Sequence, residues 1–208
     1  MRKLAPAFLL LALTLLVPAA HADSVTFTGV NGVNNGQYYV SPYFGTINGV
    51  PVTLYCVDFR NSVHIGQTWT ANLSTLTNGS NLSNTRYGGL TNALALYQQA
   101  AWLTTQFASH TNDYVNLQYA LWNLFTPSAP DTAGSNAWLA AAAANYTSIN
   151  LSNFRIVTNT APLSLTGSNQ VQEFITVVPE PASMLLFGSG MAAIAGVIRR
   201  RGKQQLAA

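Results

Sequence analysis

The sequence predicts an α+β fold, in which a single β-rich ectodomain carries a helical insertion. The stretch after position 22 alternates polar and apolar residues and is rich in Val, Thr, Tyr and Phe, which is typical of strands. The middle of the chain changes to apolar residues at helical spacing, and two strand-like runs return before position 178. Strands, then helices, then strands again indicate the α+β class.

Four strand-like runs open the domain, separated by breaks that contain Gly. They cover residues 24–30, 36–47, 50–60 and 67–73. Because successive side chains of a strand point to opposite faces, the third run is expected to place Leu54, Cys56 and Asp58 on one face. The residues between them then form the other face.

Three helices are expected in the insertion. The periodicity predicts them at residues 91–108, 114–125 and 135–146. Asn112 or Asp113 is placed to cap the second helix, and Ser135 is placed to start the third. Residues 154–159 and 171–178 return to strand composition and close the domain.

The N-terminal segment, residues 1–22, has the pattern of a secretory signal peptide. Two cationic residues precede a long apolar run, and Ala20-His21-Ala22 supplies a small-residue cleavage site. Cleavage is expected between Ala22 and Asp23. The bulk of the chain is therefore predicted to be exported.

The C-terminal segment predicts one transmembrane helix. Residues 182–198 carry no charge and, at a rise of about 1.5 Å per residue, are long enough to cross a thin hydrocarbon core. The cations that follow are Arg199, Arg200, Arg201 and Lys203. By the positive-inside rule they hold the tail in the cytoplasm and place the ectodomain, residues 23–178, on the other side of the membrane.

Val178, Pro179, Glu180 and Pro181 stand directly ahead of this span and its basic cluster. Motif, span and cations together resemble the PEP-CTERM sorting signal of Gram-negative bacteria, which would cover residues 179–203 with its motif at 178–181. The resemblance implies an exosortase as partner, in bacteria that usually also make exopolysaccharide. It implies an inner-membrane anchor before processing, and a place at the cell surface or outside the cell afterwards.

Charge and composition limit the partners of the ectodomain. The whole chain has a formal net charge of +3, but within residues 23–178 three arginines stand against four aspartates and one glutamate, which leaves −2. The excess of cations belongs to the two end segments, so nucleic-acid binding is not expected. The ectodomain has no lysine, and its Asn, Thr, Ser and Gln surface favours association with polysaccharide or with other chains.

Cys56 is the only cysteine, so a disulfide within the chain is excluded. One cysteine with the dispersed His64 and His110 gives no set of metal ligands at usable spacing, and we expect neither a metal nor a cofactor. A Cys-His hydrolase is a third alternative, although no signature surrounds the cysteine.

Two segments resemble bacterial thioester domains. Residues 55–69, YCVDFRNSVHIGQTW, are similar to the family's Cys-containing segment, and residues 117–122, LQYALW, are similar to its Thr-Gln-x-Ala-Ile-Trp segment. The resemblance implies an internal thioester with Cys56 as the thiol and Gln118 as the acyl donor. Leu117 departs from the family's Thr, and Gln98 in QQAAW is a rival acyl donor.

Two functions therefore stand ahead of the hydrolase for the ectodomain, and neither of them is that of an enzyme. The first is adhesion or matrix attachment, in which the thioester is consumed once by an amine-bearing surface protein. The absence of lysine fits this function, because no side-chain amine of the domain can consume the thioester. The second is a non-reactive structural protein of the exopolysaccharide or biofilm matrix, in which Cys56 is a small buried hydrophobe.

Overall fold

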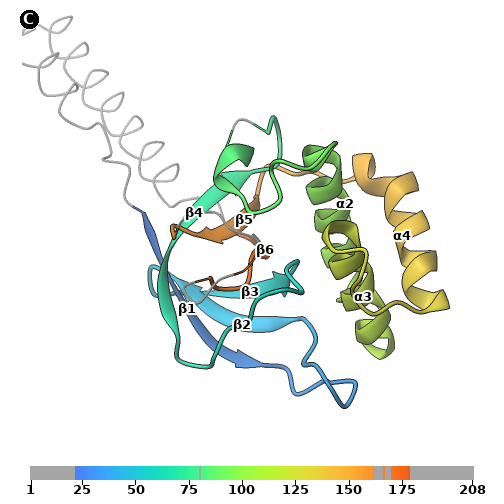
Figure 1. Cartoon of the computed structure of the whole chain (residues 1–208), viewed down its shortest axis with the longest axis horizontal. Coiled ribbons are helices and arrows are strands. Elements are labelled where there is room, and N and C mark those ends of the chain that lie inside the picture. The colour runs from blue at the N-terminus through green and yellow to red at the C-terminus, as the bar shows by residue number, and fades with distance from the viewer. Residues whose placement is uncertain (1–21, 80, 162–165, 167–169, 179–208) are drawn as a thin grey trace, which may run out of the picture.

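The computed structural model describes residues 22–79, 81–161, 166 and 170–178. In this part of the chain six strands close into a barrel, and three α-helices lie together beside it (Figure 1). The predicted α+β class is confirmed. The predicted transmembrane segment and basic cluster lie outside the described residues, and so does the predicted signal peptide apart from Ala22. Within the described part, no helix has the length and apolar character needed to cross a membrane.

The barrel strands follow one another in the order β1-β2-β3-β6-β5-β4, and every neighbouring pair is antiparallel. Their bounds are Asp23–Val30 for β1, Tyr43–Ile47 for β2, Val50–Cys56 for β3, Thr68–Thr75 for β4, Phe154–Asn159 for β5 and Phe174–Val177 for β6. β1 closes the barrel against β4, with Asp23 opposite Ala71. Because the sheet closes on itself, these strands leave no open edge for another chain.

The helices all lie between β4 and β5 in the sequence. They are α2 (Ala93–Gln106), α3 (Tyr114–Phe125) and α4 (Ala133–Asn145). Three short 3-10 helices accompany them: η1 (Leu82–Asn84) precedes α2, η2 (Thr111–Asp113) joins α2 to α3, and η3 (Tyr146–Ser148) follows α4. In Figure 1, α2 and α3 stand between the barrel and α4. The helical insertion predicted from the sequence is thus a layer on one side of the barrel.

Three strands are shorter than predicted, and one of them is β6, which spans Phe174–Val177 of the expected 171–178. In the run 36–47 the strand begins only at Tyr43, because asparagine side chains at positions 31–35 accept backbone N–H groups and hold this segment in turns. β3 ends at Cys56, so Asp58 lies beyond the strand. The prediction that Asp58 shares a strand face with Cys56 is therefore wrong.

Two helix starts also differ from the predicted caps. Asp113 stands at the N-cap of α3 without a side-chain capping bond, and its carboxylate accepts the indole N–H of Trp138 on α4 instead. α4 begins at Ala133 and not at Ser135. Thr132 is its N-cap, and Ser135 at the third helical position completes a capping box through reciprocal hydrogen bonds of 2.9 and 2.8 Å.

Two apolar clusters stabilise the fold. One fills the barrel and includes Phe27, Leu54 and Phe174. The other packs the barrel wall against the helices and includes Leu121 of α3 and Ile175 of β6. β6 is therefore buried on both faces, since Phe174 belongs to the first cluster and the adjacent Ile175 to the second.

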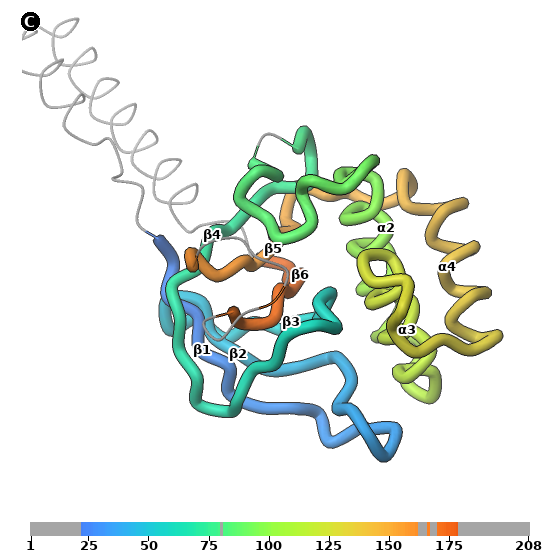
Figure 2. The backbone as a smooth tube through the Cα atoms, viewed as in Figure 1, coloured from blue at the N-terminus to red at the C-terminus, as the bar shows by residue number. Residues whose placement is uncertain are grey.

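α3 belongs to both clusters. Its Leu117 and Leu121 pack in the cluster under the helices, whereas Tyr119 and Trp122 reach the cluster that fills the barrel. The tube in Figure 2 shows α3 facing the end of β3. This contact places the middle of α3 beside Cys56, the last residue of that strand.

Candidate functional site

The structure brings Cys56 and Gln118 together across 62 positions of sequence. Both side chains are fully buried. The Gln118 amide nitrogen Nε2 donates a hydrogen bond of 2.8 Å to the backbone oxygen of Cys56. The contact joins the end of β3 to the middle of α3, so two rigid elements hold the pair.

Ser41, in the segment that precedes β2, links the two residues. Its backbone N–H donates to Oε1 of Gln118 at 2.9 Å, and its Oγ accepts the backbone N–H of Cys56 at 2.9 Å. Both ends of the Gln118 amide are thus bound, which fixes the amide plane. A backbone N–H directed at Oε1 also stabilises negative charge on that oxygen, as acyl transfer at the Gln118 carbonyl carbon requires.

The Cys56 thiol is fully buried, and both of its hydrogen-bond partners are uncharged groups. It accepts a hydrogen bond from Trp122 Nε1 at 3.4 Å and donates one to the backbone oxygen of Asp58 at 3.3 Å. Burial, and secondarily the Asp58 carboxylate, raises the pKa of the thiol to about 12. The thiol is therefore protonated at neutral pH and is a poor nucleophile towards molecules from solvent.

The other sequence candidates lie elsewhere. Gln98, on α2, donates its amide to the backbone oxygen of Leu76 at 3.0 Å, so the structure pairs it with the residue that follows β4 and not with Cys56. Among the described residues, the hydrogen-bond partners of the thiol include neither His64 nor His110. The described part also holds no cluster of three or more His, Cys, Asp or Glu residues suited to a metal ion.

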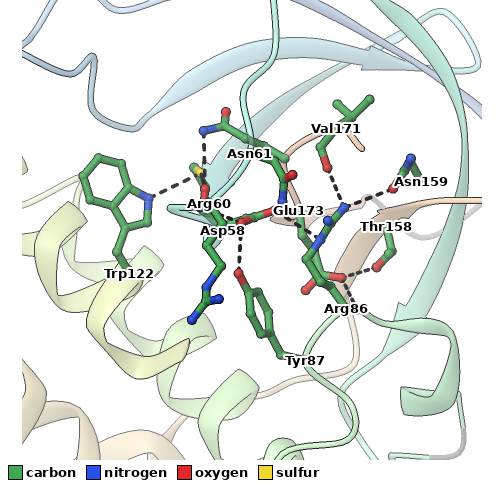
Figure 3. A network of polar contacts seen from close by, with 12 residues as sticks. Asp58, Arg60, Asn61, Arg86, Tyr87, Trp122, Thr158, Asn159, Val171 and Glu173 are labelled. Carbon is green, nitrogen blue, oxygen red and sulfur yellow. Dashed lines mark hydrogen bonds and ion pairs between the residues drawn. The ribbon is translucent and has the colours of Figure 1, made fainter. Parts of the chain in front are cut away.

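A charged cluster that the sequence analysis missed begins two residues beyond Cys56. Asp58 and Arg86 form a fully buried ion pair, with 3.1 Å between the carboxylate Oδ2 and Nε (Figure 3). Tyr87 donates its hydroxyl to the same carboxylate at 2.9 Å. The guanidinium Nη2 donates to Asn159 at 3.1 Å and to the backbone oxygen of Val171 at 2.7 Å.

Glu173, just before β6, completes this charged cluster. Its carboxylate accepts the backbone N–H of Arg86 at 2.7 Å and the hydroxyls of Thr158 and Tyr97. Burial raises the pKa of Glu173 to about 6, although these hydrogen bonds and the Arg86 charge oppose the shift. Asp58, Arg86 and Glu173 thereby tie β3, β6 and the segment before α2 to one another.

One signal in the sequence points to these residues. The ectodomain has three arginines and one glutamate, and Glu173 stands inside the strand-like run VQEFITVV. A carboxylate among apolar residues of a buried strand requires a cationic or hydrogen-bonding partner. The sequence does not say which arginine that partner is, because Arg86 is 87 positions away.

The fold and the site define an α+β protein with a closed six-stranded barrel, a helical layer and a buried Cys-Gln contact where the two meet. Residues 177–201 match the PEP-CTERM protein-sorting motif. The match marks the chain as an exported, exosortase-sorted surface protein, which is anchored in the membrane before processing. No curated protein matches the chain, and no solved structure matches it either.

Proposed function

We propose that the ectodomain forms an internal thioester between Cys56 and Gln118 and uses it once, to attach the protein covalently to an amine-bearing surface. The observation that carries this proposal is the buried contact between the only cysteine and Gln118, with Ser41 bound to both. The sorting motif supports the same use, since it delivers the domain to the outside of the cell.

Formation of the bond needs no added reagent. The Cys56 Sγ attacks the side-chain carbonyl carbon of Gln118, and the Ser41 N–H stabilises the charge that develops on Oε1. The carbon–nitrogen bond then breaks, and Nε2 leaves as ammonia with the thiol proton. Ammonia is a poor leaving group, so the reaction depends on how closely β3 and α3 hold the reacting groups.

When the thioester is used, the sulfur of Cys56 becomes the leaving group. A primary amine on another surface attacks the thioester carbonyl, Cys56 leaves as a thiol and takes a proton, and Gln118 keeps the target through an amide bond. The domain has no lysine of its own to compete. Because the product is stable and the thioester is not regenerated, the reaction has no turnover, and we do not class the protein as an enzyme.

The departure at Leu117 is compatible with this chemistry. Leu117 is fully buried in the cluster under the helices, so it packs α3 and supplies no hydroxyl. The polar contact to the Gln118 carbonyl comes from Ser41 instead, which is 77 positions away in the sequence.

The intact mass of the purified protein tests the proposal. We expect the mass to be lower than the sequence mass by one ammonia, and we expect Cys56→Ala and Gln118→Ala each to abolish the deficit. Gln98→Ala is the matched control and should keep it, since Gln98 binds Leu76. A full sequence mass, together with one thiol that titrates after unfolding, would contradict the proposal.

A non-reactive structural protein of the extracellular matrix is the second candidate. The hydrogen bonds at both ends of the Gln118 amide and the raised pKa of the Cys56 thiol favour it, because both describe an unreactive buried contact. Under this function the full sequence mass is expected, and incubation with a primary amine such as methylamine adds nothing to the protein.

A further inference from the structure

A cavity of about 900 Å³ opens at the same end of the barrel as the Cys56–Gln118 contact. Its walls include residues 37–39 before β2 and the loop 59–65, and Trp122 of α3 also lines it. We propose that this cavity binds a short stretch of acidic polysaccharide. The binding is reversible and does not depend on the proposed thioester.

Aromatic side chains give the cavity faces on which sugar rings can stack. Tyr38 packs edge-on against Phe59 and Trp122, with ring centroids 5.4 and 5.7 Å apart. Tyr39 also lines the cavity and is 54% exposed. The C–H faces of pyranose rings can pack on the faces of such aromatic rings.

The charge of the lining selects an acidic ligand. Arg60 and His64 line the cavity, and no Asp or Glu is among its described lining residues. The Arg60 side chain is exposed and makes no ion pair with any described residue. A guanidinium binds a carboxylate through two parallel hydrogen bonds, which suits a uronic acid.

The amide groups and the size of the cavity suit a sugar chain. Gln37 is exposed in the lining and can exchange hydrogen bonds with hydroxyl groups. A volume of about 900 Å³ is near the upper end for ligand pockets and is enough for several pyranose rings.

The cavity walls are held in place without a ligand. Asn31 and Asn35 accept backbone N–H groups within their own turns at 2.7–2.9 Å. The Asn35 side chain also binds the hydroxyl of Tyr119 on α3. A preformed wall lowers the ordering cost of binding.

The test uses the full-length protein in detergent micelles and three immobilised probes: polygalacturonate, dextran and poly-glutamate. We expect retention on polygalacturonate, weaker retention on dextran and a loss of retention with added salt. Arg60→Gln and Tyr39→Ala should each weaken binding at least about tenfold, because a charge-assisted contact or a stacking face is lost. Cys56→Ser cannot form a thioester but keeps an acceptor for the Trp122 indole, so it should bind as the parent does, which separates this proposal from the thioester.

Matched controls lie elsewhere on the surface. Phe44 of β2 is 48% exposed but does not line the cavity, and neither does Arg155, so Phe44→Ala and Arg155→Gln should leave binding unchanged. Equal binding by Arg60→Gln and the parent would overturn the proposal. Equal retention on dextran would overturn the selection for acid, and retention on poly-glutamate alone would assign the cavity to an acidic peptide.

Discussion

Two polar clusters meet at the end of β3, and they differ in charge. The contact of Cys56 with Gln118 and Ser41 is built from neutral groups, each held by hydrogen bonds. Two residues further on, Asp58 opens a buried cluster that contains the ion pair with Arg86. At the end of β3 the neutral pair of Cys56 and Gln118 therefore lies beside the charged cluster of Asp58, Arg86 and Glu173, which we call the charged frame.

The comparison of the two clusters indicates how the charged frame supports the neutral pair. The backbone oxygen of Asp58 accepts the Cys56 thiol, and the carboxylate of the same residue is held by Arg86 and Tyr87. Charged groups thus fix the position of a neutral acceptor without contacting the thiol directly. A charge closer to the Gln118 amide would instead alter the electron distribution of its side-chain carbonyl, on which the proposed acyl chemistry depends.

Breaking the charged frame should have the largest effect. Arg86→Met leaves the Asp58 carboxylate buried without its cation, and we expect a loss of about 3–5 kcal/mol in the free energy of unfolding. Urea denaturation of the variant and the parent measures it. Arg155→Met, which removes a partly exposed arginine, is the control and should cost less than about 1 kcal/mol. Equal losses in the free energy of unfolding for Arg86→Met and Arg155→Met would show that the charged frame contributes no more than a partly exposed arginine.

Breaking the neutral pair should cost less. Gln118→Leu leaves the Ser41 N–H and the Cys56 carbonyl without their buried partner, and we expect a loss of about 2–4 kcal/mol. The measurement is made in a Cys56→Ala background, so that no covalent bond enters the comparison. A loss greater than that of Arg86→Met would reverse the order of the two clusters.

The charged frame should also respond to pH. The pKa of Glu173 is about 6 when folded and 4.5 ordinarily, so the folded protein binds the proton more tightly. The contribution of Glu173 to stability is therefore full below pH 4.5 and is lost as the pH rises through 6, a difference of about 2 kcal/mol. Glu173→Gln should remove this dependence in unfolding curves recorded between pH 4.5 and 7. An unchanged slope would show that Glu173 does not carry it.

The smallest loss of stability is expected at the N-cap of α4, which lies away from both clusters. Thr132→Ala removes the side-chain oxygen that accepts the Ser135 N–H at the start of α4. We expect a loss of about 1 kcal/mol in the free energy of unfolding. Thr132→Ser keeps the oxygen and should restore most of the stability. If Thr132→Ala costs as much as Gln118→Leu, the neutral pair contributes no more than an ordinary cap.

The sequence predicted the elements best where local patterns decide them. The helix at 114–125 was placed at its observed bounds, because its apolar spacing and its flanking residues agree. The prediction of a strand over 36–42 was wrong, because the Asn35 side chain accepts backbone N–H groups of this segment and holds it in a turn. Closure of the barrel through β1 and β4 depends on long-range pairing, which local composition does not contain.

The site was predictable only in part. Cys56 and Gln118 were named together from the resemblance of two short segments to a known family, since spacing alone does not show that they touch. Ser41 and Arg86 were missed, because each acts through a contact more than 25 positions distant and neither stands in a recognisable motif. Long-range polar partners of this kind become visible only when the chain is folded.

β6 gives the molecule a particular response to mechanical force. It ends at Val177, where the sorting-motif match begins, so a pull on the anchor enters the fold through this strand. β6 pairs with β3 over three register positions and with β5 over four. Tension is therefore shared by two ladders and does not peel away an edge strand. Cys56 pairs with Phe174 at the far end of β6, so the residue of the proposed chemistry lies on one of the two ladders that carry the load.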